Sequence, residues 1–148
     1  SGDAPALAGD KDMLRRAFSN LLSNAIRHAS ANSRINAELS YSATSGWTIA
    51  ISNFGDAIAP AHLACLFDRF YRVDPSRQRQ GEGAGLGLAI VKSIVELHGG
   101  TIFASSEVAG SEVAISEMAS SEVATAAQAA EQKTKAALVT FVIQIAAN

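Results

Sequence analysis

The sequence predicts an α+β fold in which helices and a β-sheet form a two-layer sandwich. Three observations support this prediction: an amphipathic helical pattern near the start, two runs of alternating apolar and polar residues after it, and a second helical pattern followed by further strand-like runs. Such helices and strands bury their apolar faces against one another. The 148 residues, 48% of them hydrophobic, suffice for one core, so we expect a single domain over 1–148.

The first elements are a helix and two strands. After Gly9-Asp10, apolar residues recur at spacings of three and four, which predicts a helix. These residues are Leu14, Phe18, Leu21, Leu22, Ala25 and Ile26. Two alternating runs follow, over 35–41 and 47–53, with a Ser/Thr/Gly turn between them. They predict a pair of antiparallel strands.

The later elements are marked by proline and glycine. Pro60 suits the first position of a short helix, and Gly99-Gly100 stop a longer amphipathic one. We therefore predict a helix over 60–70, a loop over 72–87, a helix over 88–98, and strands over 101–105 and 138–145.

A five-residue repeat lies between the last two strands. Ser-Glu-Val-Ala, or once Ser-Glu-Met-Ala, begins at positions 106, 111, 116 and 121, and an Ala/Gln/Lys-rich run follows. A period of five matches neither a helix nor a strand, so no single apolar face results. We expect 106–137 to be a low-complexity insertion that is partly helical and weakly packed.

Charge, cysteine content and hydropathy exclude several kinds of partner and of covalent or metal cross-link. The formal net charge of -2 gives no global attraction to nucleic acid or to an anionic membrane. The single Cys65 excludes an intrachain disulfide and a thiolate cluster for zinc. No apolar stretch approaches the roughly 20 residues of a membrane span, so we expect no membrane contact by this chain. Any phosphate binding must be local.

A polar stripe on the first predicted helix is one candidate site. Asn20 and Asn24 are four residues apart, so they share a face, and Arg27 and His28 continue it one turn later. A carboxamide oxygen suits Mg²⁺, which the protein and a nucleotide's phosphates hold jointly, and an arginine neutralises phosphate charge. The alternative is an ordinary solvated helix face.

A glycine-rich segment and a buried asparagine are the other candidates. Residues 81–88, Gly-Glu-Gly-Ala-Gly-Leu-Gly-Leu, precede a helix, where backbone N–H groups can approach an anion; a plain flexible connector is the alternative. Neither the dinucleotide nor the Walker pattern fits. Asn53 continues the inward parity of Trp47, Ile49 and Ile51. It either binds a base edge or holds its own turn.

Four motifs together resemble the ATP-binding catalytic domain of bacterial sensor histidine kinases. Residues 20–28, Asn-Leu-Leu-Ser-Asn-Ala-Ile-Arg-His, resemble the N box, and 53–58, Asn-Phe-Gly-Asp-Ala-Ile, the G1 box. Residues 67–70, Phe-Asp-Arg-Phe, resemble the F box, and 83–88 the G2 box. They occur in the family's order and span 9–105. The stretch 66–77 is most similar to the heavy-metal (copper or silver) sensor branch.

The resemblance implies a Bergerat ATP-binding fold, which is a mixed, mostly antiparallel sheet with helices on one face. It implies ATP and Mg²⁺ as cofactors, with Asn24 coordinating the metal and Asn20 supporting it. It also implies that Arg27 contacts phosphate and that His28 lies near the ribose or phosphates. At the base, Asn53 would bond to the adenine amino group, with Gly55 and Ile58 around the ring. A lid over the phosphates would contain Gly83, Gly85, Leu86, Gly87 and Leu88, with Phe67 and Phe70 at its near end.

Two residues and one segment depart from the family pattern. Asn53 replaces the usual acid of the G1 box, and an uncharged acceptor binds the adenine amino group more weakly than a carboxylate does. Ala57 replaces the second glycine of that box. The repeat replaces the usual Gly-x-Gly-Thr turn before the last strand.

As a function, the resemblance implies transfer of the γ-phosphate of ATP to a histidine on a separate dimerisation domain of the same protein, followed by a response regulator. The three histidines of this chain lack the Glu-x-Arg-Thr-Pro context of the phosphoacceptor. We expect a cytoplasmic domain of a bacterial inner-membrane protein. Two alternatives remain: a degenerate nucleotide-binding or protein-interaction domain of the same fold, and an anti-sigma-factor-type serine kinase, against which the F box and the Arg-rich loop argue.

Overall fold

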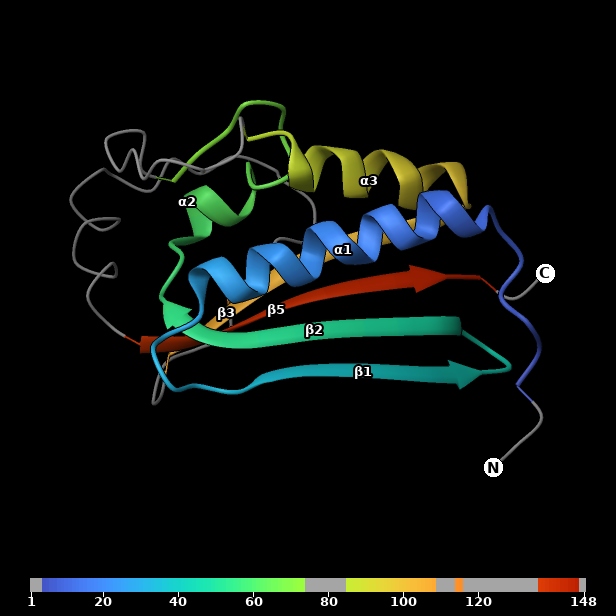
Figure 1. Cartoon of the computed structure of the whole chain (residues 1–148), viewed down its shortest axis with the longest axis horizontal. Coiled ribbons are helices and arrows are strands. Elements are labelled where there is room, and N and C mark those ends of the chain that lie inside the picture. Colours follow the sequence, from blue (N-terminus) through green and yellow to red (C-terminus); the bar gives the residue numbers. More distant parts are fainter. Residues whose placement is uncertain (1–3, 74–84, 109–113, 116–135, 147–148) are drawn as a thin grey trace.

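Two helices lie side by side on one face of a five-stranded sheet (Figure 1). The structure is a computed structural model that describes residues 4–73, 85–108, 114–115 and 136–146. The elements in chain order are α1 (Lys11–His28), β1 (Ile35–Ser42), β2 (Gly46–Asp56), α2 (Pro60–Leu63), α3 (Gly87–Leu97), β3 (Gly100–Val108), β4 (Ala114–Ile115) and β5 (Ala136–Ile145). The predicted two-layer α+β sandwich is confirmed.

The sheet has the strand order β1-β2-β5-β3-β4, and its strand pairs are antiparallel. The last strand of the chain, β5, therefore lies in the middle of the sheet. Its register places Phe141 opposite Ile51 of β2 on one side and Ala104 of β3 on the other. The predicted antiparallel pair over 35–41 and 47–53 is present as β1 and β2.

α1 begins where the sequence predicts it. The side chain of Asp10 caps the helix by accepting hydrogen bonds from the backbone N–H groups of Asp12 (3.0 Å) and Met13 (2.9 Å). Residues at helical spacing then face the sheet and are buried. These are Leu14, Ala17, Leu21 and Ala25. Leu22 and Ile26, which also belong to the apolar pattern, remain exposed beside this stripe.

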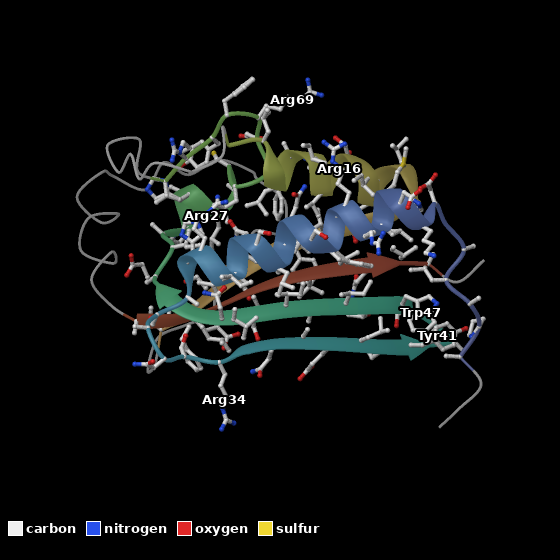
Figure 2. All side chains as sticks on the ribbon, viewed as in Figure 1. Arg16, Arg27, Arg34, Tyr41, Trp47 and Arg69 are labelled. Atoms are coloured by element: carbon white, nitrogen blue, oxygen red, sulfur yellow. The ribbon has the colours of Figure 1, made fainter. Side chains whose placement is uncertain are left out.

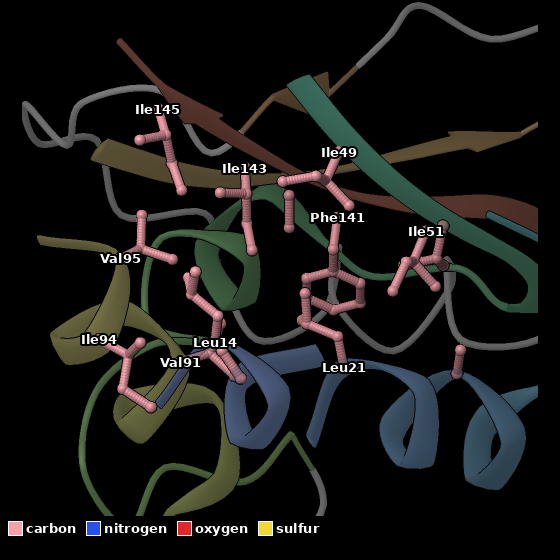
Figure 3. Packing of buried hydrophobic residues seen from close by; sticks show 14 of the residues in the cluster. Leu14, Leu21, Ile49, Ile51, Val91, Ile94, Val95, Phe141, Ile143 and Ile145 are labelled. Atoms are coloured by element: carbon pink, nitrogen blue, oxygen red, sulfur yellow. The ribbon is translucent and has the colours of Figure 1, made fainter. Parts of the chain in front are cut away.

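The core lies between the helices and the inner face of the sheet (Figure 3). The sheet contributes alternate residues of β2 and β5, as the period of two predicts, and α3 contributes residues at helical spacing. They are Ile49, Ile51, Phe141, Ile143 and Ile145 from the sheet and Val91, Ile94 and Val95 from α3. Leu39 has the same parity but is 65% exposed, because it lies on the edge strand β1.

The predicted helix over 60–70 is wrong beyond Leu63. After α2 the chain continues in linked turns in which a backbone N–H bonds to the carbonyl three residues earlier: Cys65 to His62 (3.0 Å), Asp68 to Cys65 (3.0 Å) and Tyr71 to Asp68 (3.3 Å). Such bonds give the tighter 3₁₀ geometry, which is rarely sustained as a long helix.

The predicted insertion over 106–137 is strand at both of its ends. β3 continues to Val108 and β5 begins at Ala136, because the pairing of these two strands extends to Val108 opposite Ala137. Residues 114–115 form the short strand β4 beside β3. The rest of the repeat, with its predicted partial helix, lies outside the described residues. In the part of the chain that the structure describes, no helix is long and apolar enough to cross a membrane.

Candidate nucleotide-binding site

The asparagine stripe of α1 meets the first residue of α3. Asn20 is half-buried, and its side-chain nitrogen donates to the backbone carbonyl of Gly87 over 3.4 Å, a long hydrogen bond. Asn24, also half-buried, lies one turn further along the same face. The structure therefore brings the predicted N box and the end of the predicted G2 box together, although they are far apart in the sequence.

Arg27 and His28 occupy the last turn of α1, and both are exposed. Positive charge suits this position because the C-terminus of a helix carries partial negative charge. Figure 2 shows Arg27 on the side of α1 nearest α2, whereas Arg34 points away from the helices. Arg27 is thus placed at the end of the asparagine stripe, where a flexible cation could reach a bound phosphate.

Asn53 is buried near the end of β2, with 2% of its surface exposed, as its parity predicts. Its side-chain nitrogen donates to the carbonyl of Phe54 over 3.3 Å, and the same carbonyl accepts from the N–H of Ser30 at 2.7 Å. The side chain therefore bonds to the backbone of its own strand, next to the end of α1. This bond uses the donor of the amide, whereas an adenine amino group would need its acceptor oxygen.

Gly55 has a packing role that the sequence did not reveal. A Cβ atom at this position would lie 2.4 Å from the backbone carbonyl oxygen of His28 and 3.2 Å from the side-chain nitrogen of Asn53. The end of β2 therefore touches the end of α1 backbone to backbone. This contact requires glycine whether or not a base lies nearby.

A serine of the repeat supports the segment after the G1 box. The N–H of Ile58 donates to the hydroxyl of Ser106 over 3.0 Å, and Ser106 is buried. Ile58 itself is half-buried and packs against the core. Because Ser106 is the first residue of the repeat, sequence analysis assigned it to the insertion and missed this contact.

The two F-box phenylalanines have different surroundings. Phe67 packs edge-on against Phe141 of the central strand, with ring centroids 6.2 Å apart. The side chain of Phe70 is 69% exposed, but its backbone N–H donates to the carbonyl of Gly85 over 3.0 Å. Phe67 therefore fixes this segment through the core, and Phe70 fixes it through its backbone.

The G2 box leads directly into α3. The carbonyl of Leu86 accepts from the N–H of Ile90 (2.9 Å), and Leu88 packs against the core. Gly87 is exposed, and a Cβ atom there would meet nothing within 4 Å. The helix therefore starts at the last glycine of the motif, which leaves its first N–H groups available for an anion. Gly83 lies outside the described residues.

The donors fit a magnesium ion that is shared with a ligand. Asn20 and Asn24 offer neutral carboxamide oxygens, which are hard donors suited to Mg²⁺. Within residues that the structure describes, no group of three or more His, Cys, Asp or Glu side chains could hold a metal ion. The described donors therefore suit an ion held jointly with phosphate oxygens better than an ion held by the protein alone.

Sequence analysis also missed a polar pair next to the F box. The Nδ1 atom of His62 and the hydroxyl of Tyr71 are hydrogen-bonded, and both side chains are half-buried. Burial raises the pKa of Tyr71 above its ordinary value of 10.0, with smaller contributions from nearby Cys65 and Asp68. These four residues are spaced three apart, a regularity that the linked turns explain.

Comparisons with known proteins identify the family of the chain. The family model described as "Histidine kinase-, DNA gyrase B-, and HSP90-like ATPase" matches residues 9–121. The sensor histidine kinase CusS of Escherichia coli K12 is 53% identical over 109 residues, which are 74% of this chain and 22% of that protein. The probable sensor kinase SilS of Salmonella typhimurium is 53% identical over 100 residues, which are 68% of this chain and 20% of that protein.

A solved structure supports the fold. The mycobacterial sensor histidine kinase MprB superposes with a TM-score of 0.62 at 27% identity, covering 96% of this chain and 78% of that one. The chain spans only about a fifth of the length of the curated relatives that it matches. The predicted resemblance to sensor histidine kinases, heavy-metal sensors included, is confirmed. The chain belongs to the family of histidine kinase-, DNA gyrase B- and HSP90-like ATPases, as a histidine-kinase ATPase domain.

Proposed function

We propose that the chain binds ATP with Mg²⁺ and donates the γ-phosphate to a histidine on a separate dimerisation domain of the same protein. The observation that carries this proposal is the meeting of the asparagine stripe with the start of α3, through Asn20 and Gly87. That meeting places carboxamide donors beside a glycine-rich helix N-terminus. Such a combination suits a metal-bound polyphosphate.

Each predicted site residue has a proposed task. Asn24 holds Mg²⁺ together with the phosphates, and Asn20 supports it; Arg27 contacts phosphate and His28 lies near the ribose or phosphates. Asn53 accepts from the adenine amino group, with Gly55 and Ile58 around the base. Bound Mg²⁺ would neutralise phosphate charge, and phosphoryl transfer requires mainly that neutralisation and correct positioning. Gly83, Gly85, Leu86, Gly87 and Leu88 belong to a lid over the phosphates, and Phe67 and Phe70 anchor its near end.

The phosphate acceptor is proposed to lie on another domain. His98 uses both ring nitrogens inside the fold, since Nδ1 bonds to the carbonyl of Ile94 (2.7 Å) and Nε2 accepts from the N–H of Asp10 (3.0 Å). His62 is bonded to Tyr71. These two histidines therefore serve the structure, and His28 belongs to the nucleotide site. A response regulator then takes the phosphate.

In this proposal the chain is one ATPase domain over 1–148, and the repeat within 106–137 is an insertion into it. The domain lies on the cytoplasmic side of a bacterial inner-membrane protein. Support comes from the relatives, which are sensor kinases several times longer than this chain.

Calorimetric titration with a non-hydrolysable ATP analogue tests the proposal. The wild-type domain should bind saturably in the presence of Mg²⁺ and more weakly without it. Asn24→Ala should lose the Mg²⁺-dependent part of the affinity. Asn36→Ala, which removes an exposed carboxamide from β1, is the matched control and should bind like the wild type.

A degenerate nucleotide-binding or protein-interaction domain is the second candidate. The neutral side chain of Asn53 favours it, because an uncharged acceptor binds the adenine amino group more weakly than the usual acid. A folded wild-type domain that binds no nucleotide would establish this candidate and reject the kinase. If nucleotide binds, phosphorylation of the dimerisation domain on histidine, as opposed to serine of a protein partner, separates the histidine kinase from an anti-sigma-factor-type kinase.

A further inference from the structure

The hydrogen bond between His62 and Tyr71 lies beside a contact between two backbone segments. The pair links α2 to the residues that follow the F box, and the two rings have centroids 6.1 Å apart. Tyr71 is directly preceded by Phe70, whose N–H donates to the carbonyl of Gly85. The side-chain pair and this backbone contact are therefore adjacent along the chain.

The backbone contact at Gly85 is tight, so a side chain there would require the neighbouring backbone to shift. A Cβ atom there would lie 3.0 Å from the carbonyl carbon of Phe70 and 3.1 Å from the carbonyl oxygen of Tyr71. Gly85 also has a φ of +73°, a conformation that favours glycine. We call the contact of Phe70 and Tyr71 with Gly85 the neck.

One residue of the neck is held in an unfavourable conformation. Phe70 has a φ of +63°, which is rare for a bulky side chain and persists only where the surroundings fix it. The exposed Phe70 ring supplies little packing. The next residue, Tyr71, is fixed twice: through its hydroxyl by His62, and through its N–H, which donates to the carbonyl of Asp68 over 3.3 Å.

The neck leads directly to the candidate site. Gly85 is two residues from Gly87, the first residue of α3, and the carbonyl of Gly87 accepts from Asn20. Any displacement of Gly85 must therefore change the entry into α3 and the position of its first N–H groups. Asn53, by contrast, is buried in β2, and its side chain bonds to the carbonyl of Phe54, which is not part of the neck.

We propose that His62 and Tyr71 are a positioning pair for the phosphates of the nucleotide. Neither side chain needs to touch the ligand, because the pair acts through the neck on the start of α3. The inference rests on the proposed nucleotide binding. It assigns the pair to the phosphate half of the site and leaves the adenine half independent of it.

Tyr71→Phe tests the proposal, with Tyr41→Phe as the matched control. Both substitutions remove one hydroxyl, and Tyr41 lies at the far end of β1 against Trp47. Tyr71→Phe should weaken Mg²⁺-ATP binding about three- to tenfold, the size expected for one net hydrogen bond, and leave adenosine affinity unchanged. Tyr41→Phe should change neither. Adding His62→Ala to Tyr71→Phe should cause no further loss, because the two residues act as a unit.

Hydrogen exchange gives a readout that does not depend on nucleotide. The amide of Phe70 should exchange faster in Tyr71→Phe than in the wild type and Tyr41→Phe, because its bond to Gly85 loses support. Unchanged exchange would overturn the positioning role even if binding changed. A parallel loss of ATP and adenosine affinity would overturn its restriction to the phosphates. A wild-type domain that binds neither ligand would refute the proposed function itself, whatever the exchange result.

Discussion

Gly55 and Gly87 belong to two nucleotide motifs, but their surroundings differ. A side chain at position 55 would collide with the backbone of α1, whereas position 87 is open and helical. Gly55→Ala should lower the free energy of unfolding by about 2 kcal/mol or more through overpacking. Gly87→Ala should raise it by about 0.5 kcal/mol through helix propensity. Urea denaturation measures both, and equal effects would show that the two positions are not distinguished by packing.

Tyr71 makes the stability of the domain depend on alkaline pH. Because folding raises its pKa above 10.0, mainly by burial, the folded state holds the phenolic proton more tightly than the unfolded state. Its contribution is complete below pH 10.0 and is lost as pH rises toward the folded pKa. Unfolding experiments between pH 9 and 11 should therefore show a smaller decline for Tyr71→Phe than for the wild type. Identical curves for Tyr71→Phe and the wild type would contradict the raised pKa.

For single residues, the sequence predicts the environment correctly where a periodic pattern determines it. The alternation along β2 predicted the burial of Asn53, and the four-residue spacing predicted the shared face of Asn20 and Asn24. It could not predict why Gly55 must be glycine, since that reason is the backbone of a distant helix. The bond between His62 and Tyr71 was missed for the same kind of reason.

Between elements, His98 makes a second polar connection from α3 to α1, at the opposite end of α3 from the bond between Asn20 and Gly87. Its ring joins the last turn of α3 to the N–H of Asp10, which caps α1. Since Nε2 accepts from an N–H group, Nδ1 must carry the proton in this arrangement. His98→Leu removes the ring nitrogens that bond to the N–H of Asp10 and to the carbonyl of Ile94. It should lower the free energy of unfolding by about 1 to 2 kcal/mol.

Leu97→Ala is the control for that substitution. Leu97 is the neighbouring residue, and it is 73% exposed. Its truncation should change the free energy of unfolding by less than about 0.5 kcal/mol, as for most surface positions. Thermal or chemical unfolding of the two variants makes the comparison. A similar loss of free energy of unfolding in both variants would mean that any change at the end of α3 is destabilising, and that the hydrogen bonds of His98 are not the cause.

Helices and strands with a clear period were predicted well, and segments governed by local turns were not. α1 and α3 follow from apolar spacing and from their flanking residues. The turns after α2 contain helix-forming residues, but Phe70 has a φ of +63° and donates its N–H to the carbonyl of Gly85, a distant residue that no local pattern indicates. β3 extends beyond its predicted end because β5 pairs with it there, a partner that no local pattern identifies.

For the whole molecule, nucleotide binding should raise the melting temperature. A ligand that binds only the folded state adds RT ln(1 + [L]/Kd), about 1.4 kcal/mol at ten times Kd. The fluorescence of Trp47, the only tryptophan, reports unfolding from the end of the hairpin. Mg²⁺ with the ATP analogue should raise the transition temperature of the wild type and of Asn36→Ala, and raise that of Asn24→Ala much less. An equal shift in all three would exclude Asn24 as a metal ligand.

The sequence predicted which segments form the two layers, and the family motifs predicted the segments of the candidate site, of which Asn20 and Gly87 meet in the structure. The order of the strands did not follow from periodicity, because side-chain alternation identifies a buried face and not a neighbour. The buried face of β5 shows this limit. Its alternation is clear, but its central place depends on pairing with β2 and β3 at once.

The central position of β5 has a consequence for synthesis of the protein. The residues of α1, β1, β2, α3 and β3 are synthesised before those of β5. The strand that joins β2 to β3 therefore emerges from the ribosome after all of them. Until then the inner faces of both halves lack Phe141, Ile143 and Ile145. The five-stranded sheet therefore cannot be completed before β5 emerges, and until that moment the apolar residues of β2 and β3 are exposed to chaperones and proteases.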